Sequence, residues 1–454
     1  MQNICIVFSG QQYLAWKNNG ILDNLKSHFD LEIILLNSPQ FFEDVKHFKY
    51  GNGSQVTRWL YSVNQVTKRS YSKSFSARFR RLYFSSLNLK SNNLSTKQKI
   101  IGSIHVSRQF VGFTRRNILQ TLSFIPALNF IFYTLLLKIF KKRVRIIKYS
   151  KFNFMSSVKS QILIFPSSGA EQVVFELFEL ARIENKETLM VIENWDNLTS
   201  KTTFPINPDF ITVMGEKSLV QAHDIHEIPI QNILITGLPK FEKIIEQRSV
   251  RQHKKVNFPR RKLLYLGYSL PYNEHKAITL IYSKLLEILG KDGFELTYRP
   301  HPQRQNRFFE DELTIPLSEN FKFDFKNSTT LSKLKSLPTI DLDYVSHLRS
   351  FDLIVTTPTT MVLEIMLLGI PCLVDGLDDG VHVTSPFFTL AQYLHQEDLL
   401  EISDLQVATN SEELITQIQF FLKDKSLNCD YSIQSILETE SKFSDKLIEF
   451  LLKR

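Results

Sequence analysis

The sequence predicts two α/β domains, each built on a parallel sheet. At 454 residues, the chain is longer than a single hydrophobic core usually supports. Short apolar segments typical of buried strands alternate with helical segments, which is the pattern of a parallel sheet covered on both faces. A polar, basic stretch over residues 247–261 lacks apolar periodicity and separates two such patterns. We therefore expect a first domain over residues 1–250 and a second over residues 262–425. A C-terminal helix over residues 426–454 is of the kind that in two-lobed proteins often crosses back to the first domain.

The expected strands of the first domain are short and almost wholly apolar. Helical segments at about residues 13–27 and 170–185 are expected to cover the sheet. The alternation is interrupted once, by an insert at about residues 45–155. The strands are expected over residues 3–9, 31–36, 161–165, 188–193, 209–214 and 232–236.

The second domain repeats this alternation. Its first strand, over residues 262–268, precedes a helix whose apolar residues share one stripe and which stops at Gly290. The remaining strands are expected over residues 294–299, 351–356 and 371–375, and the remaining helices over residues 344–350, 358–368, 411–423 and 432–452.

Basic residues are concentrated in one segment of the chain. Residues 45–170 contain no Asp or Glu, and they hold 23 of the 55 Lys and Arg residues. The rest of the chain carries the other 32 basic residues and all 46 acidic ones. A basic surface attracts polyanions or anionic lipid, and each Lys or Arg near a membrane adds roughly 1 kcal/mol. We expect an anionic membrane surface as a partner, and no nucleic acid.

An apolar stretch inside this insert predicts where the membrane contact lies. Residues 124–140 are almost entirely apolar, and as a helix they would be about 25 Å long, which is marginal for spanning a bilayer. A basic cluster follows at once. Such a helix suits the membrane interface, so we expect contact over about residues 124–148. A helix buried between the lobes and a transmembrane span are the alternatives.

The cysteines and the N-terminal residues favour a cytoplasmic location. Cys5, Cys372 and Cys429 are far apart in sequence and form no CxxC pair, which indicates reduced thiols. Residues 1–8 have no basic region and too short an apolar run for a signal peptide. Together with the basic insert, these features predict a peripheral protein at the inner face of the cytoplasmic membrane.

The strongest candidate site follows the expected strand 351–356. Thr357 is placed as an N-cap residue and Pro358 as the first helical residue, where a missing amide donor costs nothing. The amides and hydroxyls of Thr359 and Thr360 would then point out of a positive helix end, which binds a diphosphate. One turn later, a carboxylate is placed to accept the two hydroxyls of a nucleotide ribose. This carboxylate belongs to Glu364. A plain capped helix is the alternative.

A second candidate site lies after the expected strand 294–299, at the edge where open α/β sheets bind ligands. Prolines precede and follow His301 and hold its backbone rigid. The side chains of His301 and Arg299 can neutralise the phosphates of a leaving nucleotide without a metal ion. Gly267 and Ser269, after the first strand of this domain, would bring backbone amides close to the same phosphates. An ordinary surface histidine is the alternative.

A third candidate site follows the expected strand 188–193 of the first domain. Asp196 is a candidate general base for an acceptor hydroxyl. Asn197 and Lys201 are candidates for contacts with the acceptor or with a phosphate. Asp and Asn also favour turns, so a plain turn is the alternative.

These segments resemble a family of bacterial enzymes. They look like GT-B glycosyltransferases of capsule and lipopolysaccharide synthesis, related to the teichoic-acid glycerophosphotransferases and to the UDP-GlcNAc 2-epimerase-like superfamily. The resemblance covers about residues 160–380. It is carried by residues 194–201, 208–209, 235–241, 299–302 and 356–364.

The resemblance implies a GT-B fold, with two Rossmann-like parallel-sheet domains facing a central cleft and a basic helical insert in the first domain. It also implies that the second domain binds the nucleotide donor. Asp196 and Asn197 stand where the glycerophosphotransferases have His-Gly, a departure that favours a sugar donor over CDP-glycerol. The donor contacts implied by the resemblance are Arg299, His301, Thr359, Thr360 and Glu364.

The candidate residues and the resemblance together predict a metal-independent glycosyltransferase of hexosyl or sialyl/Kdo type. It would move a sugar from a nucleotide-sugar donor to a surface polysaccharide or lipid-linked glycan, as in O-antigen, capsule or lipooligosaccharide synthesis. His301 would stabilise the leaving nucleotide, and Asp196 would deprotonate the acceptor. No cofactor is expected besides the CMP-, CDP- or UDP-linked donor. The alternatives are a UDP-GlcNAc 2-epimerase-like enzyme, a CDP-glycerol-type glycerophosphotransferase and a non-catalytic membrane- or polyanion-binding protein.

Overall fold

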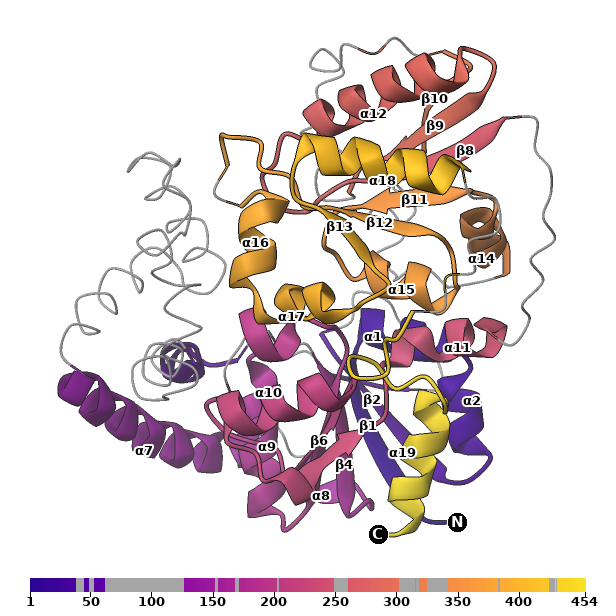
Figure 1. Cartoon of the computed structure of the whole chain (residues 1–454). Helices are drawn as coiled ribbons and strands as arrows, with labels where there is room; N and C mark the ends of the chain where they lie inside the picture. Colours follow the sequence, from indigo (N-terminus) through magenta and orange to yellow (C-terminus); the bar gives the residue numbers. More distant parts are fainter. Residues whose placement is uncertain are drawn as a thin grey trace. The chain divides into compact units, whose positions relative to one another are not determined.

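The structure, a computed structural model, divides into two compact units, each built on a parallel sheet (Figure 1). The first unit contains the described residues up to Glu242 together with Gln434–Arg454, and the second contains Lys243–Ile433. The described residues are 1–37, 45–48, 53–61, 126–151, 154–167, 171–201, 204–248, 260–301, 315, 318–324, 342–382, 384–423, 429 and 431–454.

Within the described residues, the sheet of the first unit has seven parallel strands in the order β3-β2-β1-β4-β5-β6-β7. The chain winds outward from β1 in one direction and from β4 in the other, so strand order reverses between these two strands. Both strands are almost entirely buried, as expected of the centre of a covered parallel sheet. The strands are β1 (Asn3–Ser9), β2 (Asp30–Leu36), β3 (Lys46–Phe48), β4 (Ile162–Ser167), β5 (Glu187–Ile192), β6 (Phe210–Val213) and β7 (Ile233–Ile235).

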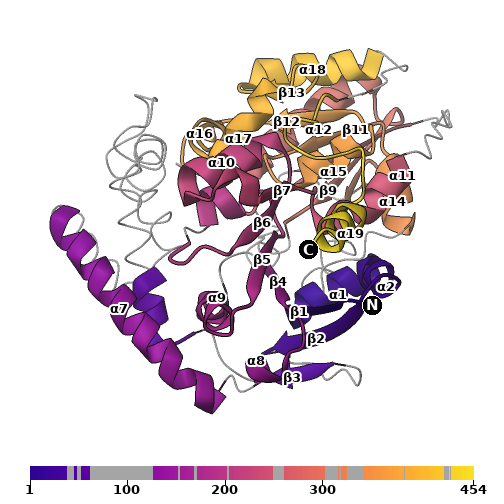
Figure 2. The same ribbon diagram turned by 90° about the horizontal axis from the view of Figure 1, so that it is seen from below.

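Helices cover both faces of this sheet. Figure 2 shows α1, α2 and α19 on one face, and α9 with α7 outside it on the other. The helix expected over residues 13–27 is two helices, because Gly20 adopts a left-handed φ of 79° between them. The helices are α1 (Gly10–Asn18), α2 (Ile21–Lys26), α7 (Pro126–Lys151), α8 (Phe154–Ser157), α9 (Val173–Ile183), α10 (Glu216–His226), α19 (Phe443–Leu452) and the short turns η2 (Asn197–Lys201), η3 (Ile230–Asn232) and η4 (Pro239–Phe241). The helix α11 (Glu242–Arg248) begins at the boundary of the two units.

The C-terminal helix α19 completes the core of the first unit. Phe443 and Leu447 are buried in the same cluster as Trp16, and the Phe443 ring meets the Trp16 ring edge-on with 5.4 Å between centroids. The Ser444 amide donates a hydrogen bond of 3.1 Å to the Glu242 carboxylate. Of the helix expected over residues 432–452, only α19 is helical.

Within the described residues, the sheet of the second unit has six parallel strands in the order β10-β9-β8-β11-β12-β13. This is the same doubly wound order, and it reverses between β8 and β11. The strands are β8 (Arg261–Leu266), β9 (Phe294–Arg299), β10 (Phe321–Phe323), β11 (Leu353–Thr356), β12 (Cys372–Asp375) and β13 (Gln406–Ala408).

Helices also cover both faces of the second sheet. Figure 1 shows α12 and α18 on one face and α14 and α15 on the other. Helix α12 ends at Gly290, as its sequence predicts, with this glycine at a positive φ of 67°. The helices are α12 (Glu274–Leu289), α14 (Leu342–Arg349), α15 (Met361–Leu367), α16 (Pro386–Gln392), α17 (Leu394–Glu397), η7 (Asp398–Glu401) and α18 (Ser411–Lys423).

The described part of the basic insert is mostly the helix α7. Residues 62–125 lie outside the described residues. No helix in the described part of the chain is long and apolar enough to cross a membrane.

Candidate functional site

The carboxyl ends of three neighbouring strands bring together the candidate residues of the second unit. In the sheet register, Leu266 at the end of β8 pairs with Arg299 of β9 on one side and with Thr356 of β11 on the other. Gly267, His301 and the Thr-Pro segment follow these strand ends, so they share one edge of the sheet. Strand order reverses at this edge, where open α/β sheets bind ligands.

Gly267 is packed too closely for any side chain. A Cβ atom at this position would lie 2.8 Å from Glu274 Oε2, 3.0 Å from the His301 amide nitrogen and 3.2 Å from Pro300 Cα. Only glycine therefore lets the loops after β8 and β9 approach this closely. His301 and Ser269, which lie in these two loops, are both half-buried.

A buried carboxylate holds the loop after β8 in place. Glu274, the first residue of α12, accepts a hydrogen bond of 2.9 Å from the Tyr268 amide. Its other oxygen accepts one of 2.7 Å from the Tyr298 hydroxyl. Both tyrosines are buried, so the loop that contains Gly267 and Ser269 is anchored on the core of the second unit.

The helix after β11 begins three residues later than expected. Instead of capping a helix, the Thr357 hydroxyl donates to the Leu266 carbonyl at 3.4 Å, and α15 begins at Met361. Thr359 and Thr360 lie half-buried in the turn before α15. Neither of their amides donates a hydrogen bond to another described residue. The prediction of a Thr357 cap is therefore wrong, while the two threonines keep their place at the sheet edge.

Glu364 has a fixed orientation. This carboxylate is buried on α15, and its Oε2 accepts a hydrogen bond of 3.0 Å from the Tyr344 hydroxyl. Burial, and then the charge of Glu364, raise the pKa of Tyr344 well above its ordinary value of 10. The tyrosine consequently remains a hydrogen-bond donor to this carboxylate.

Arg299 is already paired within the protein, which differs from the available cation expected from the sequence. Its Nε and Nη2 atoms lie 2.8 and 2.6 Å from Asp324 Oδ2, and both residues are buried. The ring of His347 lies 3.3 Å from the same oxygen. The Arg299 guanidinium is also close enough to the Tyr344 hydroxyl to lower the pKa of that hydroxyl. Arg299 therefore lies beside the tyrosine that orients Glu364, and its charge is balanced by Asp324.

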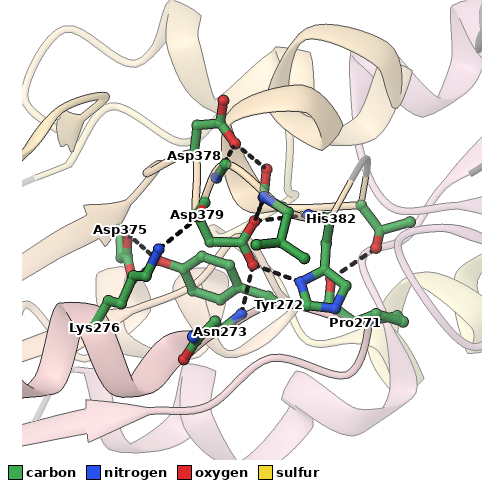
Figure 3. Close-up of polar contacts among 12 residues, drawn as sticks. Pro271, Tyr272, Asn273, Lys276, Asp375, Asp378, Asp379 and His382 are labelled. Atoms are coloured by element: carbon green, nitrogen blue, oxygen red, sulfur yellow. Dashed lines mark hydrogen bonds and ion pairs between the residues drawn. The ribbon is translucent and has the colours of Figure 1, made fainter. Parts of the chain in front are cut away.

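The loop after β12 adds a His-Asp pair that the sequence analysis missed (Figure 3). Asp379 accepts hydrogen bonds from the amides of Asn273, Val381 and His382, and its Oδ2 lies 2.6 Å from His382 Nδ1. Burial alone would raise the pKa of Asp379, but these hydrogen bonds lower it to about 2. The ionised carboxylate orients the imidazole, whose Nε2 has no partner within the described chain. The pair belongs to the same sheet edge because β12 neighbours β11.

A second buried carboxylate ties this loop to the sheet. Asp375 accepts hydrogen bonds of 2.5 Å from the Tyr265 hydroxyl and 3.0 Å from the Tyr272 hydroxyl. Burial raises the pKa of Asp375 despite these donors. Asp375 and the two tyrosines connect β12 with β8 and with the loop after β8. These hydrogen bonds hold the loops at the carboxyl ends of the strands.

The first unit carries a buried carboxyl at the corresponding edge of its own sheet. Glu193 follows β5 directly, and its Oε1 accepts a hydrogen bond of 3.0 Å from the Trp16 indole. Trp16 lies in α1, after β1, and Glu171 follows β4, so the three residues surround the point where strand order reverses. Burial raises the pKa of Glu193 to about 7; Trp16 and Lys240 lower it, and Glu171 raises it.

A carboxyl that titrates near neutral pH is what general acid–base catalysis requires. Asp196, the base predicted from the sequence, belongs to the same segment. The one available signal was an acidic residue placed directly after an apolar strand. The indole that fixes the Glu193 carboxyl belongs to Trp16, which is 177 positions away in the chain, so the sequence alone does not show this contact.

The other candidates of this segment differ in environment. Asp196 is half-buried in the turn after Glu193. Asn197 is fully buried at the start of the π-helical turn η2, where its Oδ1 accepts a hydrogen bond of 2.9 Å from the Asn194 amide. Its Nδ2 is buried and has no hydrogen-bond partner among the described residues. The side chain of Lys201 lies outside the described residues.

Among the described residues, no group of three or more His, Cys, Asp or Glu side chains is arranged to hold a metal ion.

The ionisation of Glu193 predicts a pH-dependent effect of the Glu193→Gln substitution on stability. The folded state keeps the Glu193 proton up to about pH 7, whereas the unfolded chain releases it near 4.5. The stability of the native protein should therefore fall relative to E193Q as pH rises through this window, by about 3 kcal/mol. Denaturant unfolding at pH 4.5 and pH 8 measures this difference.

The exposed Gln11 of the first unit has no titratable group and provides the control. Gln11→Ala should change stability equally at both pH values. An E193Q difference that is independent of pH would show that Glu193 is already ionised in the folded protein at the lower pH.

By sequence, no family model and no curated protein matches this chain. Solved structures do match it. The S. aureus MnaA–UDP co-structure has a TM-score of 0.50 at 10% identity, covering 100% of this chain and 97% of that one. A UDP-GlcNAc 2-epimerase of Methanocaldococcus jannaschii, in complex with UDP-GlcNAc and UDP, has a TM-score of 0.47 at 11% identity, with 100% of both chains covered. MurG of Acinetobacter baumannii has a TM-score of 0.46 at 10% identity, again with 100% of both chains covered.

At this level of identity, the likeness to the S. aureus protein concerns the fold alone. Together with the two doubly wound parallel sheets, it confirms the predicted GT-B class of two Rossmann-like domains.

Proposed function

We propose that this protein is a GT-B glycosyltransferase whose second unit binds a nucleotide-sugar donor and whose first unit activates the acceptor. The observation that carries this proposal is the shared edge after β9, β8 and β11. This edge carries the half-buried imidazole of His301, the backbone of Gly267, and Thr359 and Thr360 in the turn before α15. Imidazoles, amides and hydroxyls at such an edge bind phosphate groups.

Each donor-binding residue has a distinct proposed role. His301 stabilises the negative charge that develops on the leaving nucleotide. The amides and hydroxyls of Thr359 and Thr360 bind its phosphates. Glu364, already oriented by Tyr344, accepts hydrogen bonds from the ribose hydroxyls. Because Asp324 balances the charge of Arg299, we assign Arg299 to positioning rather than to phosphate binding.

A uridine nucleotide is the donor we test first. The S. aureus protein of similar fold was solved with UDP, which supports a UDP-linked sugar over the CMP- and CDP-linked alternatives. The acceptor proposed from the sequence is a surface polysaccharide or lipid-linked glycan, reached at the inner face of the cytoplasmic membrane. The acid-free, basic insert supports this acceptor, since it would keep the enzyme beside anionic lipid.

Two carboxyls of the first unit compete for the role of general base. Burial raises the pKa of Glu193 to about 7, and the Trp16 indole fixes its position, so this carboxyl combines basicity with a defined place. Asp196, the residue predicted from the sequence, lies three residues later and is half-buried. We favour Glu193 as the base, and substitution of each residue in turn distinguishes it from Asp196.

Substitution of donor-site residues should weaken nucleotide binding. Loss of a hydrogen bond to a charged group costs about 1.5–3 kcal/mol, so His301→Ala and Glu364→Ala should each weaken UDP binding by roughly tenfold or more. Titration calorimetry with UDP, CMP and CDP measures this effect and ranks the three nucleotides. His28→Ala, an exposed histidine of the first unit, is the control and should bind as the native protein does. Unchanged affinity in both donor-site variants would remove the proposed site.

Substitution of the base should slow transfer without weakening nucleotide binding. Glu193→Gln is expected to lower kcat by roughly 10²- to 10⁴-fold, the usual contribution of a general base, while Asp196→Asn stays within a few-fold of native. In the native enzyme, kcat should rise with pH through about 7, because only the ionised carboxylate accepts a proton. A sugar-transfer assay over this pH range tests both statements. The reverse order of the two variants would assign the base to Asp196.

A sugar-nucleotide epimerase is the second candidate function. The same buried carboxyl favours it, since removal of a proton from a sugar carbon also needs a base whose pKa lies near neutral. Incubation with UDP-N-acetylglucosamine alone in D₂O separates the two activities. We expect neither an epimer nor deuterium at the sugar carbon by NMR, and formation of an epimer would replace the transferase proposal.

A further inference from the structure

The helix α7 carries apolar residues on two different faces. Leu136, Phe140 and Val144, spaced by four residues, are buried on one face. This face packs toward α9, and the Tyr133 hydroxyl donates a hydrogen bond of 3.1 Å to the Pro205 carbonyl. One face of α7 therefore packs the helix onto the first unit.

The other apolar face is exposed. Ile131, Leu135, Ile139 and Ile146 have exposed fractions of 62, 52, 43 and 64%. Successive spacings of four, four and seven residues place them in one line along the helix. This exposed stripe is about 22 Å long at the rise of an α-helix. Apolar residues gathered in a line mark an interaction surface, whereas single ones do not.

Basic side chains surround the exposed stripe. By helical position, Lys138, Lys141 and Arg145 follow one border and Arg143 the other, while Lys142 lies within the line. All five are exposed. The sequence has no Asp or Glu between residues 45 and 170, so no acidic residue of the helix or of the surrounding insert offsets this charge.

We infer that the exposed stripe of α7 lies in the headgroup region of an anionic bilayer, with the helix parallel to the membrane surface. The apolar side chains enter the acyl boundary, and the Lys and Arg side chains extend to the lipid phosphates. The occupant is an anionic lipid surface because an apolar line is bordered by cationic side chains, which matches the acyl layer and the charged headgroup layer of such a surface. This inference is independent of the proposed enzymatic activity.

Vesicle binding of the whole 454-residue chain tests this assignment. Flotation with vesicles of phosphatidylcholine, with and without phosphatidylglycerol, should show binding to the anionic vesicles that weakens as salt rises. Ile131→Asn, Leu135→Asn and Ile139→Asn combined should lower the affinity by about tenfold or more. Charge reversal of Lys138, Lys141 and Lys142 to Glu should remove the preference for anionic vesicles.

A matched control removes exposed apolar residues elsewhere on the first unit. Val220 and Ile230 are 51 and 53% exposed, and Val220→Asn with Ile230→Asn should bind vesicles as the native protein does. Thermal unfolding followed by circular dichroism checks that every variant is folded. Native-like vesicle binding by the folded stripe variant would overturn the inference. So would a stripe variant that changes only the sedimentation coefficient of the free protein, which would indicate a contact between copies of the chain. Titration of the stripe variant with UDP keeps the two proposals apart. A variant that loses vesicle binding should still bind UDP as the native protein does, because the stripe has no role in the proposed donor site.

Discussion

Both units depend on one topological constraint, the reversal of strand order in a doubly wound parallel sheet. The chain leaves β1 and β4 in opposite directions in the first unit, and β8 and β11 in opposite directions in the second. The loops after these strands diverge, so backbone amides and side chains remain accessible at the strand ends. In the second unit, Gly267 also lets the loops after β8 and β9 approach each other closely, since any Cβ there would meet Glu274 and His301.

The buried carboxylates at these edges differ in how many donors they have. In the second unit, Glu274, Asp375 and Asp379 each accept two or more hydrogen bonds from amides or tyrosine hydroxyls. Such groups hold loops in place. In the first unit, burial of Glu193 is opposed mainly by the single Trp16 hydrogen bond, and its pKa rises to about 7. Glu193 thus has fewer donors than these three carboxylates, and its pKa near neutral suits it to exchange protons.

The segregation of charge along the chain has a structural counterpart in α7. One face of this helix satisfies the packing of the first unit, and the remaining apolar residues are left on the outside among Lys and Arg side chains. A helix that only filled the core would have a polar outer face. The second apolar line is the surface to which we assign the lipid contact.

The sequence by itself determined the class of the fold and the sheet edge that the candidate donor-site residues share. Near-continuous apolar strands such as β4 and β9, alternating with helices, are a local signal that requires no knowledge of distant contacts. The start of α15 was misplaced, because the Thr357 hydroxyl bonds to the end of β8 rather than to its own helix. Whether a charged group is available or already paired was decided only by tertiary structure. Arg299 meets Asp324 and Glu193 meets Trp16 across long stretches of chain, and burial and pairing together set the charge state of a side chain.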